Sequence, residues 1–211
     1  MTVATRRERE QQMRRDAILE AAKELFRDKG FESTTVDEIA ALAELGKGTI
    51  YSYFKSKDEI YIAILESEFE VLEKWMVEAI ENSTTAEDAL SKLYDTFIKY
   101  NRERRGFIKA LFVQVDQQPS VGMAEILRGL KGKTAEWTRL VGQVLQGGID
   151  RGESDSFDVE RMAKVVIGLI LGLIVQSEMG QIKEDLSNYR DTLFRLILKG
   201  IIHDESVLAE R

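Results

Sequence analysis

The stretch TTVDEIAALAELGKGTIYSYFKSK, residues 34–57, contains the strongest structural signals in this chain. Thr35 followed three residues later by Glu38 is the pattern of a capping box, in which each side chain hydrogen-bonds an otherwise unpaired backbone N–H at the start of a helix. Apolar residues then recur at helical spacing, a turn of about three residues follows at 44–46, and a second short helix is predicted over Lys47–Phe54. Two short helices joined by a tight turn predict a helix-turn-helix.

Helices are also predicted on both sides of this stretch. The first covers about Met13–Lys29 and is followed by Gly30, a residue that readily adopts the positive φ found just beyond a helix C-terminus. Downstream, Ser56 and Glu59 form a second capping-box pattern, which opens a long helix that reaches about Ile80. No flexible linker follows, so this long helix should connect the small N-terminal module to the rest of the chain.

The charge of residues 46–57 differs from that of the whole chain. The segment contains three lysines and no carboxylate, although the chain has a net charge of −7. Carboxylates here would repel DNA, whereas hydroxyl groups can donate to phosphates and base edges. Gly48 would let the backbone come close to a groove, and backbone N–H groups at a helix start favour phosphate. The segment is therefore a candidate recognition helix.

Composition limits the other classes of function. Apolar residues at helical spacing and a single proline, Pro119, predict an all-α protein. Without cysteine and with His203 as the sole histidine, the usual zinc and haem ligand sets cannot be assembled, and nothing requires a catalytic site. We therefore expect no enzyme, no metal and no cofactor. The N-terminus lacks a signal-peptide pattern, and the longest apolar run, 165–175, is far short of the roughly 20 residues that span a bilayer, so we expect a cytoplasmic protein.

Residues 13–65 resemble the tetracycline-repressor (TetR) family of transcriptional regulators. The resemblance combines AILEAAKELFRDKGFES, the capping threonines, the short turn, the pattern K-G-T-x-Y-x-Y-F and a lysine three residues after the phenylalanine. It implies a DNA-binding domain over residues 1–57, a helical effector-binding and dimerisation domain over 58–211, and a repressor as the usual mode of action. The sequence departs from the family pattern at Glu44, often Gly, and at Gly46, usually a polar cap.

The resemblance implies DNA contacts at matching positions, to which the hydroxyl of Ser52 is added from the residues themselves: Thr35, Lys47, Gly48, Thr49, Tyr51, Ser52, Tyr53 and Lys57. Several alternatives stay open. Asp37 either accepts a hydrogen bond from a cytosine base or interacts favourably with the helix dipole. The two tyrosines are either core residues or DNA contacts. Five N-terminal arginines form either an arm that reaches a groove or a solvated helix surface: Arg6, Arg7, Arg9, Arg14 and Arg15.

The segment DVERMAKVVIGLILGLIVQSEMG, residues 158–180, is apolar nearly all round and must be covered on more than one side. Gly168 and Gly172 would allow a second helix to approach closely. The resemblance implies that this segment and the last helix pair with their copies in a four-helix dimer interface, and a two-fold dimer would bind a near-palindromic operator. The alternative is ordinary core within one chain. The expected interface residues are Val165, Gly168, Leu169, Gly172, Leu193, Leu196, Ile197 and Ile201.

A small effector is the remaining expected partner. Segments that surround the central cavity in TetR-like proteins carry a mainly apolar and aromatic set, most of which is equally compatible with plain core: Phe97, Tyr100, Phe107, Leu111, Phe112, Gln114, Met123 and Trp137. The expected ligand is largely apolar or aromatic, anchored by one or two polar groups such as Gln114 or Asn101. The rival interpretation is a helical small-molecule-binding or adaptor protein that does not bind DNA.

Overall fold

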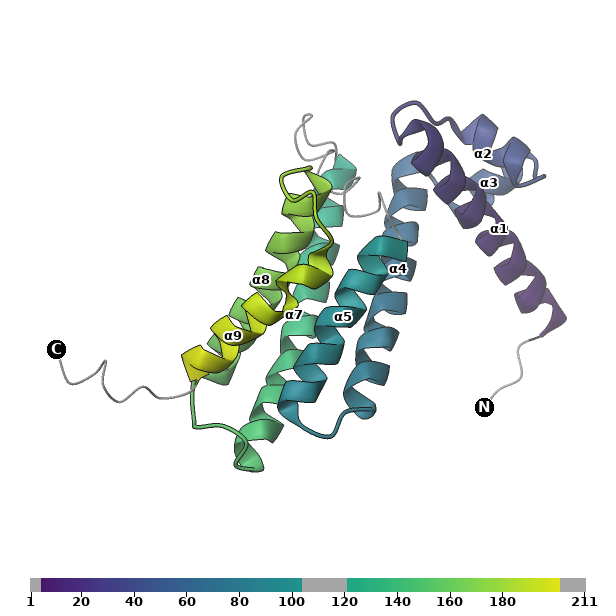
Figure 1. The fold of residues 1–211 in the computed structure, drawn as a ribbon. Coiled ribbons are helices and arrows are strands. Elements are labelled where there is room, and N and C mark those ends of the chain that lie inside the picture. The colour runs from purple at the N-terminus through teal and green to yellow at the C-terminus, as the bar shows by residue number, and fades with distance from the viewer. Residues whose placement is uncertain (1–4, 104–120, 202–211) are drawn as a thin grey trace. The chain divides into compact units, whose positions relative to one another are not determined.

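The computed structural model describes residues 5–103 and 121–201, with side chains outside 121–131 and 198–201 (Figure 1). Over these ranges the chain forms helices and short connections, with no strand, which confirms the predicted all-α class. None of the described helices is both long enough and apolar enough to cross a membrane.

Three helices and the start of a fourth build the N-terminal part: α1 (Arg6–Lys29), α2 (Val36–Leu42), α3 (Lys47–Tyr53) and α4 (Lys57–Glu81). Each contributes one fully buried isoleucine to a shared core, namely Ile18, Ile39, Ile50 and Ile60. Helix α1 ends at Gly30, whose φ of 82° confirms the positive value expected there.

Helix α1 begins earlier than the sequence pattern of apolar residues indicated. Thr5 caps it by accepting a hydrogen bond from the backbone N–H of Glu8, whose carboxylate in turn accepts from the Thr5 N–H. This capping box at Thr5 extends the helix through the arginine-rich segment. The N-terminal arginines therefore lie on a helix. Both alternatives for them, contact with a DNA groove and a solvated helix surface, stay predictions.

The C-terminal part consists of the second portion of α4 with α5 (Ala86–Glu103), α7 (Val121–Asp150), α8 (Val159–Glu178), the 3-10 helix η2 (Leu186–Tyr189) and α9 (Arg190–Ile201). Helix α5 packs against α8, η2 and α9. Its aromatic residues also reach α4 and α7, since Tyr100 meets Trp75 with ring centroids 6.0 Å apart and Phe97 meets Trp137 at 5.6 Å. Burial of these rings makes α5 the central helix of this core.

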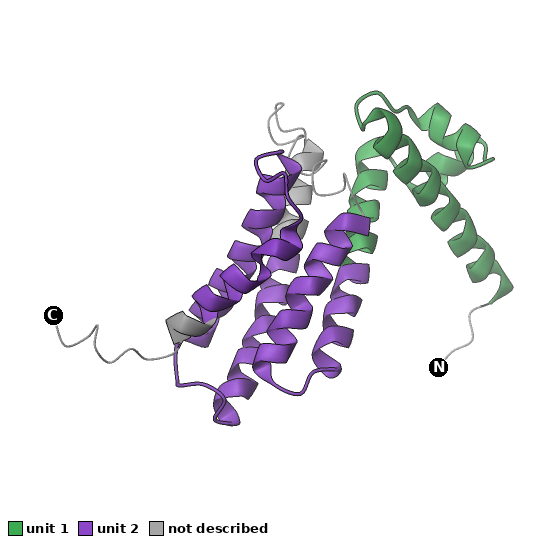
Figure 2. Ribbon diagram, viewed as in Figure 1, with its two compact units in different colours: residues 1–69, 110–129 green, residues 70–109, 130–211 purple. Residues whose placement is uncertain are grey.

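The described residues fall into two compact units, and the division passes through α4 between residues 69 and 70 and through α7 between residues 129 and 130 (Figure 2). The first unit contains α1–α3, and the second contains α5, α8 and α9. Helices α4 and α7 thus each begin in the first unit and end in the second. A functional division after residue 57 remains a prediction.

Candidate DNA interface

The start of α2 is fixed by the predicted capping box. Thr35 Oγ1 accepts from the Glu38 backbone N–H at 3.3 Å, and Glu38 Oε2 accepts from the Thr35 N–H at 2.8 Å. The Glu38 carboxylate also forms an ion pair with Lys29 at the end of α1. Lys29 and, after it, Thr35 stabilise the ionised form and lower the pKa of Glu38 to about 2. The box therefore joins the end of α1 to the start of α2.

This arrangement predicts a pH dependence. Because the folded pKa of Glu38 lies below its unfolded value, the carboxylate stabilises the fold above about pH 4.5. That stabilisation is lost as the pH falls from 4.5 towards 2. We expect Glu38→Gln to unfold at lower urea concentration than the unmodified protein at pH 7, with the difference shrinking below pH 4.5. A constant difference from pH 7 to pH 2.5 would contradict the assignment.

The turn between α2 and α3 contains the two residues that depart from the family pattern, Glu44 and Gly46. Glu44 has a φ of 54°, in the left-handed region that a glycine adopts without strain. This backbone conformation costs a non-glycine residue of order 1 kcal/mol, so packing around the turn must compensate for it. Gly46 precedes α3 and supplies no side-chain cap, as expected from its lack of a polar group. Its carbonyl oxygen accepts from the Thr49 N–H at 2.8 Å.

Helix α3 has one buried and one open face. Ile50 and the C-cap residue Phe54 are buried, which confirms the predicted inward pair. Tyr51 is 48% exposed, so it is not a core residue, and Tyr53 is half-buried. Lys47, Gly48 and Ser52 are exposed and Thr49 is half-buried, which leaves the predicted contact residues of α3 at or near the surface: Lys47, Gly48, Thr49, Tyr51, Ser52 and Tyr53.

Two polar groups of this face already have partners in the free protein. Lys47 Nζ pairs with Asp37 at 2.8 Å, and this hydrogen bond raises the pKa of Lys47. Both side chains are more than half exposed, and exposed pairs contribute little free energy, so phosphate could replace Asp37. Ser52 Oγ donates to the Thr49 carbonyl oxygen at 2.6 Å and keeps its lone pairs as acceptors. Asp37 is thus a partner of Lys47 within this unit.

Lys57 has a structural role that the sequence analysis missed. Its ammonium group donates to three carbonyl oxygens of the turn between α1 and α2, at 2.6 Å to Phe31, 3.2 Å to Glu32 and 3.0 Å to Thr34. It also lies 4.3 Å from the centroid of the Phe31 ring. Three donors on one ammonium match three carbonyls, so its hydrogen-bonding capacity is used within the unit. A DNA contact by Lys57 remains a prediction and would require giving up one of these bonds.

Gly48 allows the fold and the interface to be tested separately. A Cβ added there meets nothing within 4 Å, and Ala is more favourable than Gly inside a helix by up to about 1 kcal/mol. We expect Gly48→Ala to raise the free energy of unfolding slightly while lowering DNA affinity, because in the predicted interface the added methyl group would lie between the α3 backbone and the duplex. Urea unfolding and fluorescence anisotropy on the same sample check this. An increase or no change in DNA affinity would remove Gly48 from the interface.

The structure describes the side chains of three of the predicted effector residues, and the cavity that the set is expected to line stays a prediction. Phe97, Tyr100 and Trp137 are buried against neighbouring rings as core residues. Phe107, Leu111, Phe112 and Gln114 lie outside the described residues, and of Met123 only the backbone is described. An open pocket of about 320 Å³ occurs elsewhere in the second unit. Its apolar wall and polar rim come from α4, α5, α7 and the connections after α4 and α7: Val77, Ile80, Ala89, Leu140, Val144, Glu81, Gln143 and Arg151.

Helices α8 and α9 leave large apolar side chains uncovered in the single chain. Val165 is 52% exposed and Leu196 is 62% exposed. A Cβ added at Gly168 or Gly172 meets nothing within 4 Å, so these glycines are not required for packing within the protomer. The rest of the predicted set divides: Leu169 is half-buried, Leu193 and Ile197 are buried in the protomer, and the side chain of Ile201 is not described.

A three-helix unit with a short α2, a tight turn and a solvent-facing α3 defines a helix-turn-helix DNA-binding protein. Residues 18–64 match the family model described as bacterial regulatory proteins, tetR family. The chain is 26% identical to the uncharacterised HTH-type transcriptional regulator YhgD of Bacillus subtilis, over 89% of this chain and 96% of that protein. It is 23% identical to the negative transcriptional regulator IcaR of the biofilm operon icaADBC in Staphylococcus aureus, over 87% of this chain and 96% of that protein.

A solved structure extends the likeness to the whole fold. The transcriptional regulator FadR from Bacillus subtilis in complex with stearoyl-CoA superposes with a TM-score of 0.67 at 25% identity, covering 89% of this chain and 99% of that chain. Over residues 18–64 the chain therefore carries the DNA-binding domain of the TetR family, and its relatives over most of its length are transcriptional regulators. Its relatives are regulators and not enzymes, in agreement with the predicted absence of catalysis.

Proposed function

We propose that this regulator acts as a homodimer that occupies a near-palindromic operator and represses transcription until a small effector releases it. The proposed DNA binding rests on the exposed face of α3, which combines Lys47, Gly48 and Tyr51 and contains no carboxylate. Phosphate contacts supply much of the affinity of such proteins, and base contacts supply the specificity. Repression is supported by the likeness to IcaR, a negative regulator.

The exposed apolar face of α8 and α9 supports the dimer. Val165 and Leu196 are large apolar side chains in contact with solvent in the single chain, and Gly168 gives room for a partner helix. Covering such a face with its own copy is an isologous contact with two-fold symmetry. Two recognition helices would then meet half-sites about one duplex turn or a multiple of it apart.

The effector is proposed to be largely apolar, and a long-chain acyl group is the favoured candidate. Support comes from the likeness to FadR, whose structure contains stearoyl-CoA. The pocket of about 320 Å³ in the second unit has an apolar wall beside Gln143 and Arg151, at the lower end of the size of ligand pockets. An effector releases DNA only to the extent that it binds the DNA-free state more tightly.

The test uses fluorescence anisotropy of a labelled duplex from upstream of the protein's own gene. Fatty acyl-CoA esters of graded chain length are titrated into the complex, with free coenzyme A as the control. The proposal predicts release that strengthens with chain length and no release by coenzyme A. Release by phosphorylated sugars or metal ions, with acyl compounds inactive, would contradict the proposed effector class and leave the DNA-binding proposal intact.

A further inference from the structure

A groove beside α3 is lined on its other side by α1, within the first unit. Its volume is about 390 Å³. Helix α3 contributes Thr49, Ser52 and Tyr53, and α1 contributes Arg7, Glu10, Gln11 and Arg14. Residues 7, 11 and 14 recur at the spacing of one helical face, so the extended start of α1 presents a continuous strip to this groove. The capping box at Thr5 stabilises the helical start of α1 that presents these residues.

The acidic side chains in the first half of α1 are occupied by local partners. Glu8 accepts hydrogen bonds from Thr5, which lower the pKa of Glu8. Glu10 pairs with Arg6 at 2.8 Å, and Asp16 accepts from Gln12 at 2.7 Å. Glu10 is the one carboxylate among the residues that line the groove, and Arg6 balances its charge. The residues that line the groove therefore carry a net positive charge.

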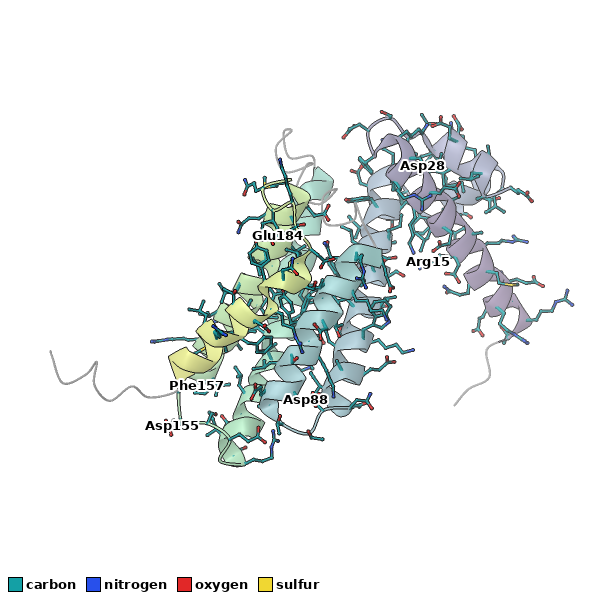
Figure 3. All side chains as sticks on the ribbon, in the orientation of Figure 1. Arg15, Asp28, Asp88, Asp155, Phe157 and Glu184 are labelled. Carbon is teal, nitrogen blue, oxygen red and sulfur yellow. The ribbon has the colours of Figure 1, made fainter. Side chains whose placement is uncertain are left out.

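The arginines of α1 divide into engaged and available groups. Besides Arg6, Arg15 (labelled in Figure 3) is engaged, because its guanidinium lies 5.5 Å from the centroid of the Phe54 ring. Arg7 and Arg14 are exposed, line the groove and form no ion pair with any residue in 5–103 or 121–201. They are two unbalanced cations that flank the α3 residues Thr49, Ser52 and Tyr53.

We propose that Arg7 and Arg14 bind phosphates of the DNA strand that passes α3, so that α1 extends the interface beyond the recognition helix. This inference rests on the proposed DNA-binding function. A guanidinium presents parallel N–H donors that match a phosphate group, and hydroxyl groups on the opposite wall can donate to the same backbone. Phosphate contacts fix register and affinity but carry no base preference. Both arginines therefore position the protein on any sequence that α3 reads.

The test compares Arg7→Gln and Arg14→Gln with Arg9→Gln. Each removes one positive charge from the exposed part of α1, but Arg9 does not line the groove. The full chain is titrated onto a duplex selected by the protein from a random pool, at salt concentrations from 50 to 200 mM. Each groove variant should lower the slope of log Kd against log salt by about 0.9, so its disadvantage shrinks about 3.5-fold across this range. Arg9→Gln should keep the wild-type slope, and base preference should stay unchanged in all three.

Ethylation interference identifies the phosphates directly. In each half-site, at least one ethylated phosphate that blocks the unmodified protein should no longer affect Arg14→Gln, while Arg9→Gln shows the unmodified pattern. Equal slopes and equal interference for all three folded variants would overturn the inference while leaving the proposed function in place. Failure of the unmodified protein to select any DNA would overturn the proposed function, and the inference with it.

Discussion

Lys57→Ala is expected to lower the free energy of unfolding of the N-terminal unit by about 2–4 kcal/mol. The substitution removes three hydrogen bonds from a charged donor to the carbonyls of Phe31, Glu32 and Thr34, together with a cation–π contact to the Phe31 ring. Hydrogen bonds to charged groups contribute about 1.5–3 kcal/mol and cation–π contacts about 0.5–2 kcal/mol, and water at the turn recovers part of the loss. Urea unfolding followed by circular dichroism measures the effect.

Lys55→Ala is the matched control for this prediction. Lys55 is exposed and lies two residues away, so its replacement removes the same charge from the same segment. We expect it to change stability by no more than about 0.5 kcal/mol, the usual range for surface substitutions. Equal unfolding midpoints for the two variants would show that Lys57 does not hold the turn. A loss of DNA affinity in Lys57→Ala is informative only after this comparison, because a weakened turn also displaces α2.

Leu196→Glu is expected to separate the dimer and weaken operator binding by at least about 100-fold. The side chain is 62% exposed in the single chain, so glutamate there leaves the protomer folded but places a charge in the proposed apolar interface. Two linked DNA-binding units gain roughly 10²–10⁴ in apparent affinity over one, and a monomer loses this gain. Analytical ultracentrifugation at micromolar concentration and anisotropy with the selected operator give the two readouts.

Leu196→Met is the control at the same position, since it conserves volume and polarity. It should sediment as a dimer and bind the operator like the unmodified protein. Val165→Glu, on α8, should repeat the effect of Leu196→Glu if both residues belong to one interface. If the unmodified protein sediments as a monomer, or if Leu196→Glu remains a dimer, the proposed face is not the interface.

Features fixed by local sequence were predictable. The capping box at Thr35 and Glu38, the positive φ of Gly30 and the inward pair of Ile50 and Phe54 all depend on residues a few positions apart. The early start of α1 was missed, although Thr5 and Glu8 carry the same capping pattern. That pattern precedes a polar, arginine-rich segment without an apolar stripe, so helical periodicity could not reveal it.

Features that depend on distant contacts were not predictable from one sequence. The carbonyl partners of Lys57 lie 23 to 26 residues earlier in the chain and leave no periodic signal. On the last helix, Leu193 and Ile197 are buried in the protomer whereas Leu196 faces solvent, a division that depends on the packing of α9 against η2 and α5. Aromatic residues at helical spacing likewise cannot be divided between core and cavity, and Phe97 and Trp137 belong to the core.

We propose that the exposed face of α3 binds a specific DNA sequence as part of a two-fold dimer. Duplexes can be selected from a random pool by the full chain, and the bound fraction can be sequenced. We expect enrichment of one near-palindromic motif, with half-sites separated by about one duplex turn or a multiple of it. A bound fraction with no enriched motif, at salt concentrations low enough for phosphate contacts to form, would contradict it.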